Sequence, residues 1–347
     1  MKSTAKLLSV STAVPPYKFD QQKVKETISQ IYSGPRNVLE KMMPIYQNSG
    51  ILNRYSCVPM DWYKNPVGWA DKNKLFLEHS LDLLEQAATT CLAQAGKIVE
   101  EVDALVVVTS SGIATPTLDA RLMQRMPFRQ NVQRLPIFGL GCAGGTLGLA
   151  RAASLARDDK DKLVLFLVVE LCGLTFRQRD FSKSSLIATA LFGDGAAAAL
   201  ISCKGEGPEL TAWGEHTWPN TLEIMGWNVM DDGLAVQFSR DIPSIIHREI
   251  PAVIDNFLHH QGLKRQDINS WICHPGGAKV LTAYEDALDL DTQALEHSRI
   301  ILRDYGNMSA ATILFVLKQA LTTGIEGRSL LTSLGPGFST GFLLMES

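Results

Sequence analysis

The sequence predicts an α/β fold in which two similar halves pack together as a layered α/β/α/β/α body. Strand-like runs rich in β-branched residues alternate with helical stretches, which is typical of mainly parallel sheets with helices on both faces. The same order of elements occurs on either side of the turn-forming segment GEGP at 205–208. We therefore divide the chain into residues 1–204 and residues 205–347, each forming one half.

The first half is predicted to contain strands and a helix arranged around a glycine-rich turn. This turn, LGCAGGT, contains Cys142 and joins a strand to a helix. The helix is expected directly after the turn because apolar residues recur there at helical spacing. The predicted elements are strands at 7–14, 103–109, 135–140 and 163–169 and a helix at 147–156.

The second half repeats this order, although few residues are identical. One strand ends at His274, just before the tight turn PGG, and a helical stretch then leads to the turn YGNMSA, which contains Asn307. From Val107 to Cys142 is 35 positions, and from His274 to Asn307 is 33. An internal duplication explains the similar spacing. The predicted elements are strands at 270–274 and 329–334 and a helix at 310–321.

Composition and charge exclude several classes of protein. Of the 347 residues, 46% are hydrophobic and 20% are charged, which is typical of a globular protein rather than a disordered one. The net charge of −3 argues against nucleic-acid binding through phosphates, and no run of about 20 apolar residues predicts a membrane span. The six cysteines show no CxxC pair or metal-ligand spacing, so we expect reduced thiols, no metal site and a cytoplasmic location.

The two halves differ in charge. Residues 1–204 carry a net charge of +6 and residues 205–347 a net charge of −9, which places an anionic ligand nearer the first half. Within that half Arg121, Arg125 and Arg129 recur every fourth residue, which predicts that they lie on one face of a helix. That face either meets the ligand or is simply solvated.

Cys142 is the candidate nucleophile. A thiol at a helix N-terminus lies beside unpaired N–H groups and a partial positive charge, which lower its pKa. Two other interpretations remain open. Cys142 could be a small buried apolar residue, or GLGCAG could be a G-x-G-x-x-G dinucleotide site with Glu170 at the end of the next strand. The cysteine inside the loop and the lack of matching glycines in the second half argue against a dinucleotide site.

Cys142, His274 and Asn307 lie at strand or helix ends that the duplication would bring to one face. A thiol, an imidazole and an amide donor together are the groups that acyl transfer requires. A cysteine hydrolase of the papain kind uses the same three residue types. Because the C-G-[SA]-C-[WY] signature of that class is absent, acyl transfer is the favoured reaction.

Several longer segments resemble one known family. LGCAGG, ALFGDGAAAAL, CHPGGAKVL, YGNMSAATILFVL and LGPGF are similar in order and spacing to segments of the type III polyketide synthases, the chalcone and stilbene synthases of the thiolase fold. The similarity covers nearly the whole chain and is weakest before Arg54. SSGIATPTLDARLM, LPIFGLGCAGG, ELCGLTF and MGWNVMDDGLAVQFSRDIP most resemble the bacterial members that make long-chain alkylpyrones and alkylresorcinols.

The resemblance implies a role for each matching residue. Cys142 matches the family's nucleophile, and His274 and Asn307 match its catalytic histidine and asparagine. Phe192 matches a phenylalanine at the gate between the CoA tunnel and the reaction chamber, whereas Val236 stands where the family has a second gate phenylalanine. The remaining matches are the tip of a loop that enters the partner subunit (Thr115), the chamber walls (Cys172, Thr175 and Ser309) and the residues expected near the CoA phosphates (Lys41 and Arg54). Plant members have further basic residues at the positions of Pro44 and Asn48.

The activity that the resemblance implies is a decarboxylative condensation of malonyl-CoA onto an acyl-CoA starter held on Cys142. Both CoA thioesters are substrates, so no cofactor is expected, and the family pattern implies a homodimer. Val236 leaves a wider passage than phenylalanine would, which favours a long-chain starter and an alkylpyrone or alkylresorcinol product. The alternatives are a β-ketoacyl-acyl-carrier-protein synthase III, which makes a single condensation, and a non-catalytic acyl-CoA binding relative. The YGNMS and HPGG segments favour the polyketide branch.

Overall fold

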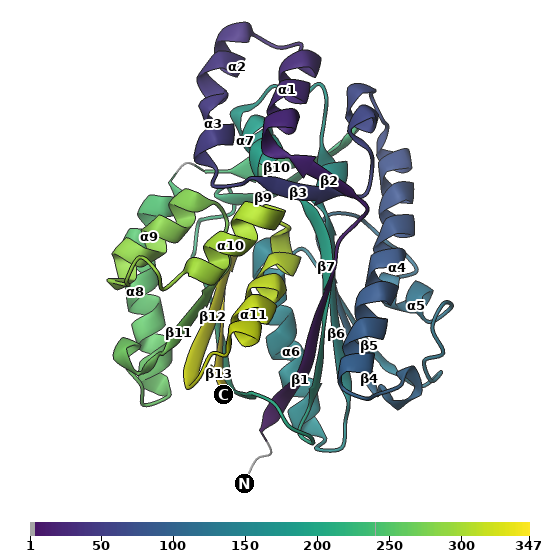
Figure 1. The fold of residues 1–347 in the computed structure, drawn as a ribbon, viewed down its shortest axis with the longest axis vertical. Helices are drawn as coiled ribbons and strands as arrows, with labels where there is room; N and C mark the ends of the chain where they lie inside the picture. The colour runs from purple at the N-terminus through teal and green to yellow at the C-terminus, as the bar shows by residue number, and fades with distance from the viewer. Residues whose placement is uncertain (1–3, 240) are drawn as a thin grey trace.

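The computed structural model describes residues 4–239 and 241–347 of the chain. Residues 1–3 and Arg240, which belongs to one of the segments that carry the family resemblance, lie outside the described residues. Five layers are stacked side by side in the order helices, strands, helices, strands, helices (Figure 1). The predicted layered fold class is therefore confirmed.

Both halves contain the predicted strands and helices, together with a cap of smaller elements. The first half comprises β1 (Ala5–Ala13), β2 (Tyr17–Asp20), α1 (Gln21–Ile31), α2 (Arg36–Met42), α3 (Pro44–Asn48), β3 (Asn53–Ser56), α4 (Trp69–Gln94), β4 (Ala104–Thr109), α5 (Leu118–Leu122), β5 (Gln133–Phe138), α6 (Gly144–Asp158), β6 (Val164–Leu171), α7 (Lys183–Leu191) and β7 (Asp194–Ser202). The second comprises β8 (Glu209–Thr217), β9 (Met225–Met230), β10 (Gly233–Phe238), α8 (Ile242–His260), β11 (Ser270–Cys273), α9 (Ala278–Leu288), α10 (Glu296–Tyr305), α11 (Thr312–Thr323), β12 (Arg328–Gly335) and β13 (Ser339–Glu346).

The main sheet has nine strands in the order β11-β12-β13-β8-β1-β7-β6-β4-β5. The expectation of mainly parallel pairing is wrong, because five of the eight neighbouring pairs are antiparallel. The connections explain this. β12 and β13 are joined by a tight turn, and α7, between β6 and β7, packs on the cap rather than crossing a sheet face.

The duplication is visible in the strand order. In the first half β4, β6, β7 and β1 are neighbours, and in the second half β11, β12, β13 and β8 follow the same order. The orientations also match, since the first pair of each set is parallel and the next two pairs are antiparallel. β5 is an addition of the first half at one edge of the sheet.

Helices cover both faces of each half-sheet, which explains the continuous apolar runs in the sequence. α6 and α11 lie between the two half-sheets, α4 covers the outer face of the first, and α8 with α9 covers the outer face of the second (Figure 1). Alternate residues of β4 point to opposite faces of the sheet. Val106 packs towards α6 in the central cluster, whereas Leu105 packs towards Leu84 of α4.

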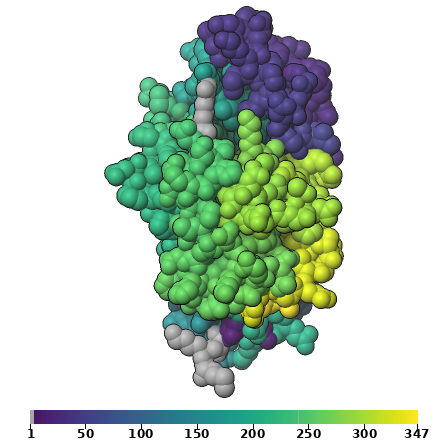
Figure 2. Space-filling view, turned by 90° about the vertical axis from the view of Figure 1, so that its left-hand side faces the viewer, coloured from purple at the N-terminus to yellow at the C-terminus, as the bar shows by residue number. Residues whose placement is uncertain are grey.

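A cap of α1–α3, β2, β3 and α7 covers one end of the layers, and the hairpin of β9 and β10 packs beside it (Figure 1). The space-filling view shows α1–α3 in purple above the green second half (Figure 2). Asp20 starts α1 by accepting hydrogen bonds from the backbone N–H groups of Gln22 and Lys23, at 2.8 and 3.2 Å. The cap places side chains from both halves around the ends of the strands.

The three regularly spaced arginines do not share a helix face. α5 ends at Leu122, so only Arg121 belongs to it, and the chain then turns. Arg125 pairs with Asp82 at 2.6 Å, and Arg129 pairs with Asp103. Arg125 and Arg129 therefore form ion pairs with neighbouring carboxylates. None of the described helices is both long and apolar enough to cross a membrane.

Candidate active site

The elbows of the two halves touch each other. Cys142 lies in the short 3₁₀ turn η3 (Gly141–Ala143) before α6, and Asn307 precedes the matching turn η6 (Ser309–Ala311) before α11. A Cβ atom on Gly145 would lie 2.2 Å from the carbonyl oxygen of Ala310, so only glycine allows this approach. The glycines after Cys142 therefore pack one half against the other.

The dinucleotide interpretation of this segment is wrong. Gly141 has a φ of +48°, and a Cβ atom on it would lie 2.5 Å from Pro336 Cδ, so this glycine too meets the other half. Glu170 is fully buried, and its Oε2 accepts a hydrogen bond from the backbone N–H of Ser110 at 3.0 Å. A carboxylate held in this way is not available to a ribose.

Cys142, His274 and Asn307 line one cavity of about 510 Å³ between the halves. His274 follows β11, and its backbone N–H donates to the carbonyl oxygen of Thr332 at 2.9 Å. Asn307 is held at both ends of its amide: Nδ2 donates to the carbonyl oxygen of Gly276 at 3.3 Å, and Oδ1 accepts from the backbone N–H of Ser309 at 2.8 Å. The duplication thus brings the three predicted residues together.

Burial decides the protonation of the resting site. It raises the pKa of Cys142 to about 12, although the neighbouring Ser309 and Asn307 side chains oppose this rise. It lowers the pKa of His274 to about 3, and neither ring nitrogen has a hydrogen-bond partner. The predicted lowering of the Cys142 pKa is therefore wrong, because burial of the thiol raises it instead. The site holds a thiol and a neutral imidazole.

Two further polar groups lie beneath the thiol. Ser309 Oγ lies 3.7 Å from Cys142 Sγ, which places this predicted wall residue directly against the nucleophile. Burial raises the pKa of Glu170 to about 7, and its Oε1 has no hydrogen-bond partner. The sequence indicated Glu170 only as part of a dinucleotide site and not as a neighbour of the nucleophile. The available signal was a single carboxylate in the otherwise apolar strand VLFLVVEL.

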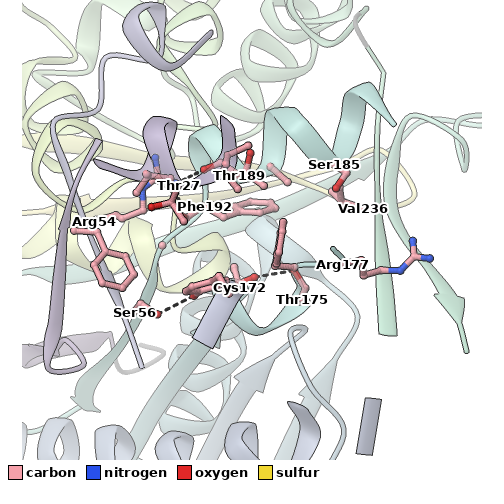
Figure 3. A pocket seen from close by; sticks show the side chains of 18 of the residues that line it. Thr27, Arg54, Ser56, Cys172, Thr175, Arg177, Ser185, Thr189, Phe192 and Val236 are labelled. Atoms are coloured by element: carbon pink, nitrogen blue, oxygen red, sulfur yellow. Dashed lines mark hydrogen bonds between the residues drawn. The ribbon is translucent and has the colours of Figure 1, made fainter. Parts of the chain in front are cut away.

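A second, narrower cavity of about 80 Å³ lies in the cap (Figure 3). Its walls include five residues assigned from the resemblance, namely Arg54, Cys172, Thr175, Phe192 and Val236. The ring of Phe192 packs near the rings of Phe238 and Trp227, with centroids 5.7 and 6.1 Å away.

An isolated β-bridge joins the backbone of one wall residue of each cavity. Phe192, a wall of the cap cavity, pairs with Asn307, a wall of the catalytic cavity. The N–H of Asn307 donates to the carbonyl oxygen of Leu191 at 2.9 Å, and the N–H of Gly193 donates to that of Asn307 at 3.0 Å. Phe192 therefore stands at the boundary between the cavity that holds Cys142 and the cap cavity.

The remaining predicted residues lie in three different places. Lys41 lines the catalytic cavity beside Pro44 and Asn48, as a residue that meets a ligand there would. Thr115 is exposed and lines neither cavity. Arg54 is buried, and its guanidinium donates to the carbonyl oxygens of Thr189, Ala190 and Phe192 at 2.6, 2.8 and 2.9 Å.

The assignment of Arg54 to CoA phosphates is therefore wrong, because its donors already hold the backbone around Phe192. Within residues 4–239 and 241–347, no three His, Cys, Asp or Glu side chains gather in a way that could hold a metal ion.

Comparisons with known proteins match both halves of the chain. The family model of the chalcone and stilbene synthase N-terminal domain matches residues 1–205, and that of the C-terminal domain matches residues 209–347. The chain is 37% identical to the 1,3,6,8-tetrahydroxynaphthalene synthase of Streptomyces peucetius subsp. caesius, over 97% of this chain and 92% of that protein.

Solved structures of similar proteins superpose over almost the full length. The 1,3,6,8-tetrahydroxynaphthalene synthase of Streptomyces coelicolor A3(2), a bacterial type III polyketide synthase, gives a TM-score of 0.94 at 26% identity, covering 99% of both chains. The C-terminal type III polyketide synthase domain of the Dictyostelium hybrid Steely1 gives a TM-score of 0.92 at 26% identity, also covering 99% of both chains.

Proposed function

Because the chain belongs to the chalcone and stilbene synthase family and is thus an acyltransferase of the type III polyketide synthase kind, we propose that it extends a long-chain acyl-CoA starter with malonyl-CoA. The lengthened chain then closes to an alkylpyrone or alkylresorcinol. The observation that carries the proposal is one cavity lined by Cys142, His274 and Asn307, separated by Phe192 from an apolar cap cavity.

Loading of the starter begins with the neutral Cys142–His274 pair. When the acyl-CoA thioester displaces water from the cavity, a ring nitrogen of His274 accepts the thiol proton, since both nitrogens are free of hydrogen bonds. Cys142 Sγ then attacks the thioester carbonyl, the acyl group passes to the cysteine, and CoA leaves as a thiol with the proton from His274. The helix N-terminus at α6 favours the sulfur anion during this step.

Chain extension uses His274 and Asn307 as hydrogen-bond donors. Malonyl-CoA binds with its thioester carbonyl near His274 and the Asn307 amide and loses CO₂. Their N–H groups stabilise the oxygen of the resulting enolate, an effect that is strong where water is excluded. The enolate carbon attacks the acyl-cysteine, and Cys142 leaves as the thiolate. The longer chain is then a CoA thioester, and Cys142 takes it back by attacking its carbonyl as CoA leaves. CoA thioesters supply all the atoms, so no cofactor takes part.

The CoA end and the acyl end of the starter occupy different regions. Lys41, at the wall of the catalytic cavity, meets the CoA phosphates, while the acyl chain passes Phe192 into the cap cavity. The cap cavity suits an alkyl chain because many of its wall residues are apolar. They include Phe19, Val24, Ile28, Leu234 and Val236.

Two other functions fit parts of the site. A β-ketoacyl-acyl-carrier-protein synthase III would make one condensation, and a non-catalytic relative would bind acyl-CoA without extending it. Incubation with labelled malonyl-CoA and an acyl-CoA, followed by mass spectrometry of the products, separates these functions. We expect several malonyl units per starter and a cyclised product. A single condensation, no condensation, or a product made from malonyl-CoA alone would contradict the proposal.

Val236→Phe should shift the starter preference towards shorter acyl chains. Val236 and Phe192 both line the cap cavity, so a second aromatic ring would narrow the passage between them. Each buried methylene contributes about 0.8 kcal/mol, so long chains should be favoured in the wild type until the cavity is filled. The measurement is kcat/KM for a series of saturated acyl-CoAs of increasing length.

Ala235→Phe is the matched control for this experiment. Ala235 precedes Val236 in β10 and projects to the opposite face of the strand, away from the cap cavity. We expect it to keep the wild-type length profile. A wild type that prefers acetyl-CoA or a coumaroyl-type thioester, or a Val236→Phe profile equal to that of the wild type, would contradict a boundary at this residue.

The protein should be a homodimer in solution. β5 pairs only with β4 in the described part of the chain, and it exposes 58% of Phe138 and 37% of Leu135. An open sheet edge with exposed apolar residues is typical of an interface, and Thr115 lies on the exposed loop before α5. Light scattering at micromolar concentration should give twice the 38.1 kDa chain mass.

Phe138→Glu tests whether this edge forms the interface. We expect the variant to shift the mass in solution towards that of the monomer. Leu222 is 77% exposed and lies away from β5, so Leu222→Glu should leave the dimer intact. A monomeric wild type, or a dimer that persists unchanged in Phe138→Glu, would contradict an interface at β5.

A further inference from the structure

Phe176 and Arg177 form the partition between the cap cavity and a groove on the surface. Both residues line the cap cavity, and both also line a neighbouring open groove of about 470 Å³. The groove has apolar side chains along part of its wall, from Trp62, Pro66, Val67 and Met230. No other residue lines both spaces.

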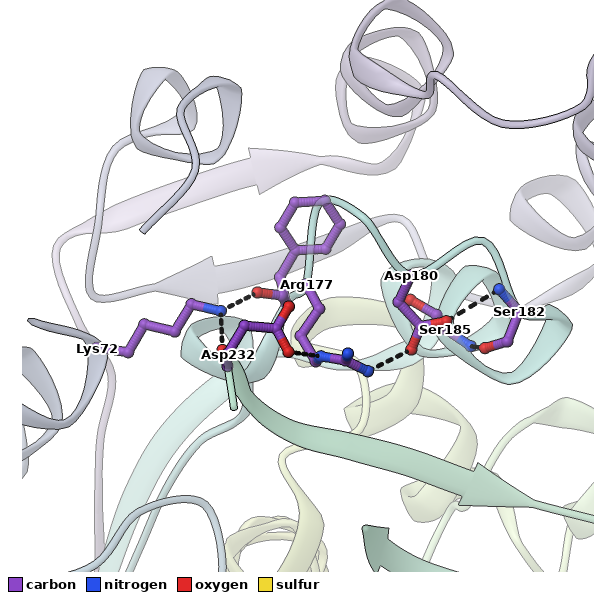
Figure 4. A network of polar contacts seen from close by, with 7 residues as sticks. Lys72, Arg177, Asp180, Ser182, Ser185 and Asp232 are labelled. Carbon is purple, nitrogen blue, oxygen red and sulfur yellow. Dashed lines mark hydrogen bonds and ion pairs between the residues drawn. The ribbon is translucent and has the colours of Figure 1, made fainter. Parts of the chain in front are cut away.

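A group of polar contacts, which we call the latch, holds this partition in place (Figure 4). Arg177 Nε donates to Asp232 Oδ1 at 2.6 Å, and Arg177 Nη1 donates to Asp180 Oδ2 at 2.9 Å. Lys72 Nζ donates to the carbonyl oxygen of Phe176 at 2.6 Å and to that of Asp232 at 3.1 Å. The latch thus consists of Lys72, Arg177, Asp180 and Asp232.

The latch joins three elements of the fold. Lys72 belongs to α4, Arg177 and Asp180 to the segment before α7, and Asp232 to the two-residue turn between β9 and β10. β10 carries Leu234 and Val236, both of which line the cap cavity. A movement of the hairpin at Asp232 would therefore move the wall beside Phe192 as well as the partition.

The two ion pairs of the latch differ in exposure. The side chain of Arg177 is 14% exposed and that of Asp180 13%, but the Asp232 side chain is 43% exposed. Ion pairs at the surface contribute little to stability, because water solvates the separated charges well. The link between Arg177 and Asp232 is therefore the contact that opens most readily.

The volumes of the two spaces indicate how the latch could affect chain length. The closed cap cavity offers about 80 Å³, whereas the groove beyond the partition offers about 470 Å³. An alkyl chain that fills the first space gains nothing from further methylenes unless it enters the second. Each methylene buried beyond that point would raise affinity about fourfold.

We propose that the latch determines the length of the acyl chain that the enzyme accepts, a proposal that rests on the proposed long-chain starter. When Arg177 is bound to Asp232, the alkyl tail ends at Phe176. When this ion pair is open, the tail continues into the groove. Arg177 is accordingly a specificity-determining residue that never contacts the reacting atoms. The groove takes the apolar end of the starter chain, between Trp62, Val67 and Met230.

Arg177→Met tests the proposal, since methionine keeps an unbranched apolar stem but neither ion pair. Two properties are measured: binding of saturated fatty acids of increasing length by calorimetry, and kcat/KM for the matching acyl-CoAs with malonyl-CoA. We expect wild-type affinity to level off at one length and that of the variant to keep rising beyond it. Two further methylenes should then raise kcat/KM at least about tenfold over the wild type.

Three other variants complete the experiment. Asp232→Asn breaks only the exposed pair and should show the same direction of change if Arg177→Met does not fold. Arg177→Lys keeps a charge but can meet only one of the two carboxylates, so its length profile should lie between those of the wild type and Arg177→Met. Arg125→Met removes the ion pair between Arg125 and Asp82, which has the same length, 2.6 Å, as that between Arg177 and Asp232. Arg125 lines neither the cap cavity nor the groove, so this variant should keep the wild-type length profile.

The outcomes separate the latch from the proposed function. If the wild type binds fatty acids and both latch variants level off at the same length, the latch is overturned and the starter class stands. The latch is also overturned if wild-type affinity never levels off, or if Arg125→Met shifts the profile as much as Arg177→Met. If no fatty acid of any length binds either protein, the long-chain starter and the latch are overturned together.

Discussion

Cys142→Ala should abolish polyketide formation while malonyl-CoA decarboxylation remains measurable. Alanine removes the only atom that carries the acyl chain, but it leaves the two donors that stabilise the enolate, His274 and Asn307, in the same cavity. His274→Ala and Asn307→Ala should instead reduce both decarboxylation and product, by about a hundredfold or more each, because every oxyanion donor is worth roughly 3 kcal/mol. The measurement is CO₂ release and product formation in the same reaction.

Two buried cysteines provide controls for the nucleophile. Cys172 lines the cap cavity, and Cys273 ends β11 one position before His274, so neither replacement removes the acyl carrier. We expect Cys172→Ala and Cys273→Ala to keep product formation, with Cys172→Ala free to change the length profile. Product formation at the wild-type rate in Cys142→Ala, together with its loss in either control, would contradict the assignment of Cys142.

Arg54→Met should destabilise the protein by about 3 to 5 kcal/mol, because each buried acceptor that loses its donor costs about 1 to 3 kcal/mol. Arg54 is 5% exposed, and its guanidinium donates to three carbonyl oxygens of residues 189–192 and to Gln21 Oε1. Methionine would leave the carbonyl oxygens of Thr189 and Phe192 without this donor, whereas that of Ala190 still accepts from Gln21 Nε2 at 3.0 Å. Urea denaturation should show the loss as a lower midpoint with an unchanged slope.

Arg248→Met is the matched control for Arg54. The Arg248 side chain is 65% exposed and pairs only with the adjacent Glu249, so its replacement should change stability by less than about 0.5 kcal/mol. Arg54→Lys should remain well below the wild type, because an ammonium group cannot span the same carbonyls as a planar guanidinium. Equal midpoints for Arg54→Met and Arg248→Met would contradict a structural role for Arg54.

Local pattern predicted most of the elements that form the layers. The β-branched run at 103–109 is β4, the run at 163–169 lies in β6, and the turn at Cys142 leads into α6. Strand direction was not predictable in this way, because it depends on where the connecting segment packs. α7 has the length of a crossover helix, but it packs against the cap, so β6 and β7 are antiparallel.

The catalytic residues were predictable because their position in the duplicated pattern places them at the same junction. Cys142 and Asn307 occupy corresponding elbows, and the contact at Gly145 brings those elbows together. Charge states were not predictable, since burial, which raises the pKa of Cys142 to about 12, is a property of the packed cavity. Arg54 shows the same limit, because its three carbonyl partners are about 135 residues away in sequence and leave no local pattern.

The contact between the two elbows also affects the order in which the activity arises during synthesis. The ribosome makes the half that carries Cys142 first, and domains generally fold in that order. His274 and Asn307 belong to the other half, so the emerging chain has a thiol but no donors for an enolate. Under the proposed function, the site is therefore complete only after the second half has folded and Ala310 has packed against Gly145.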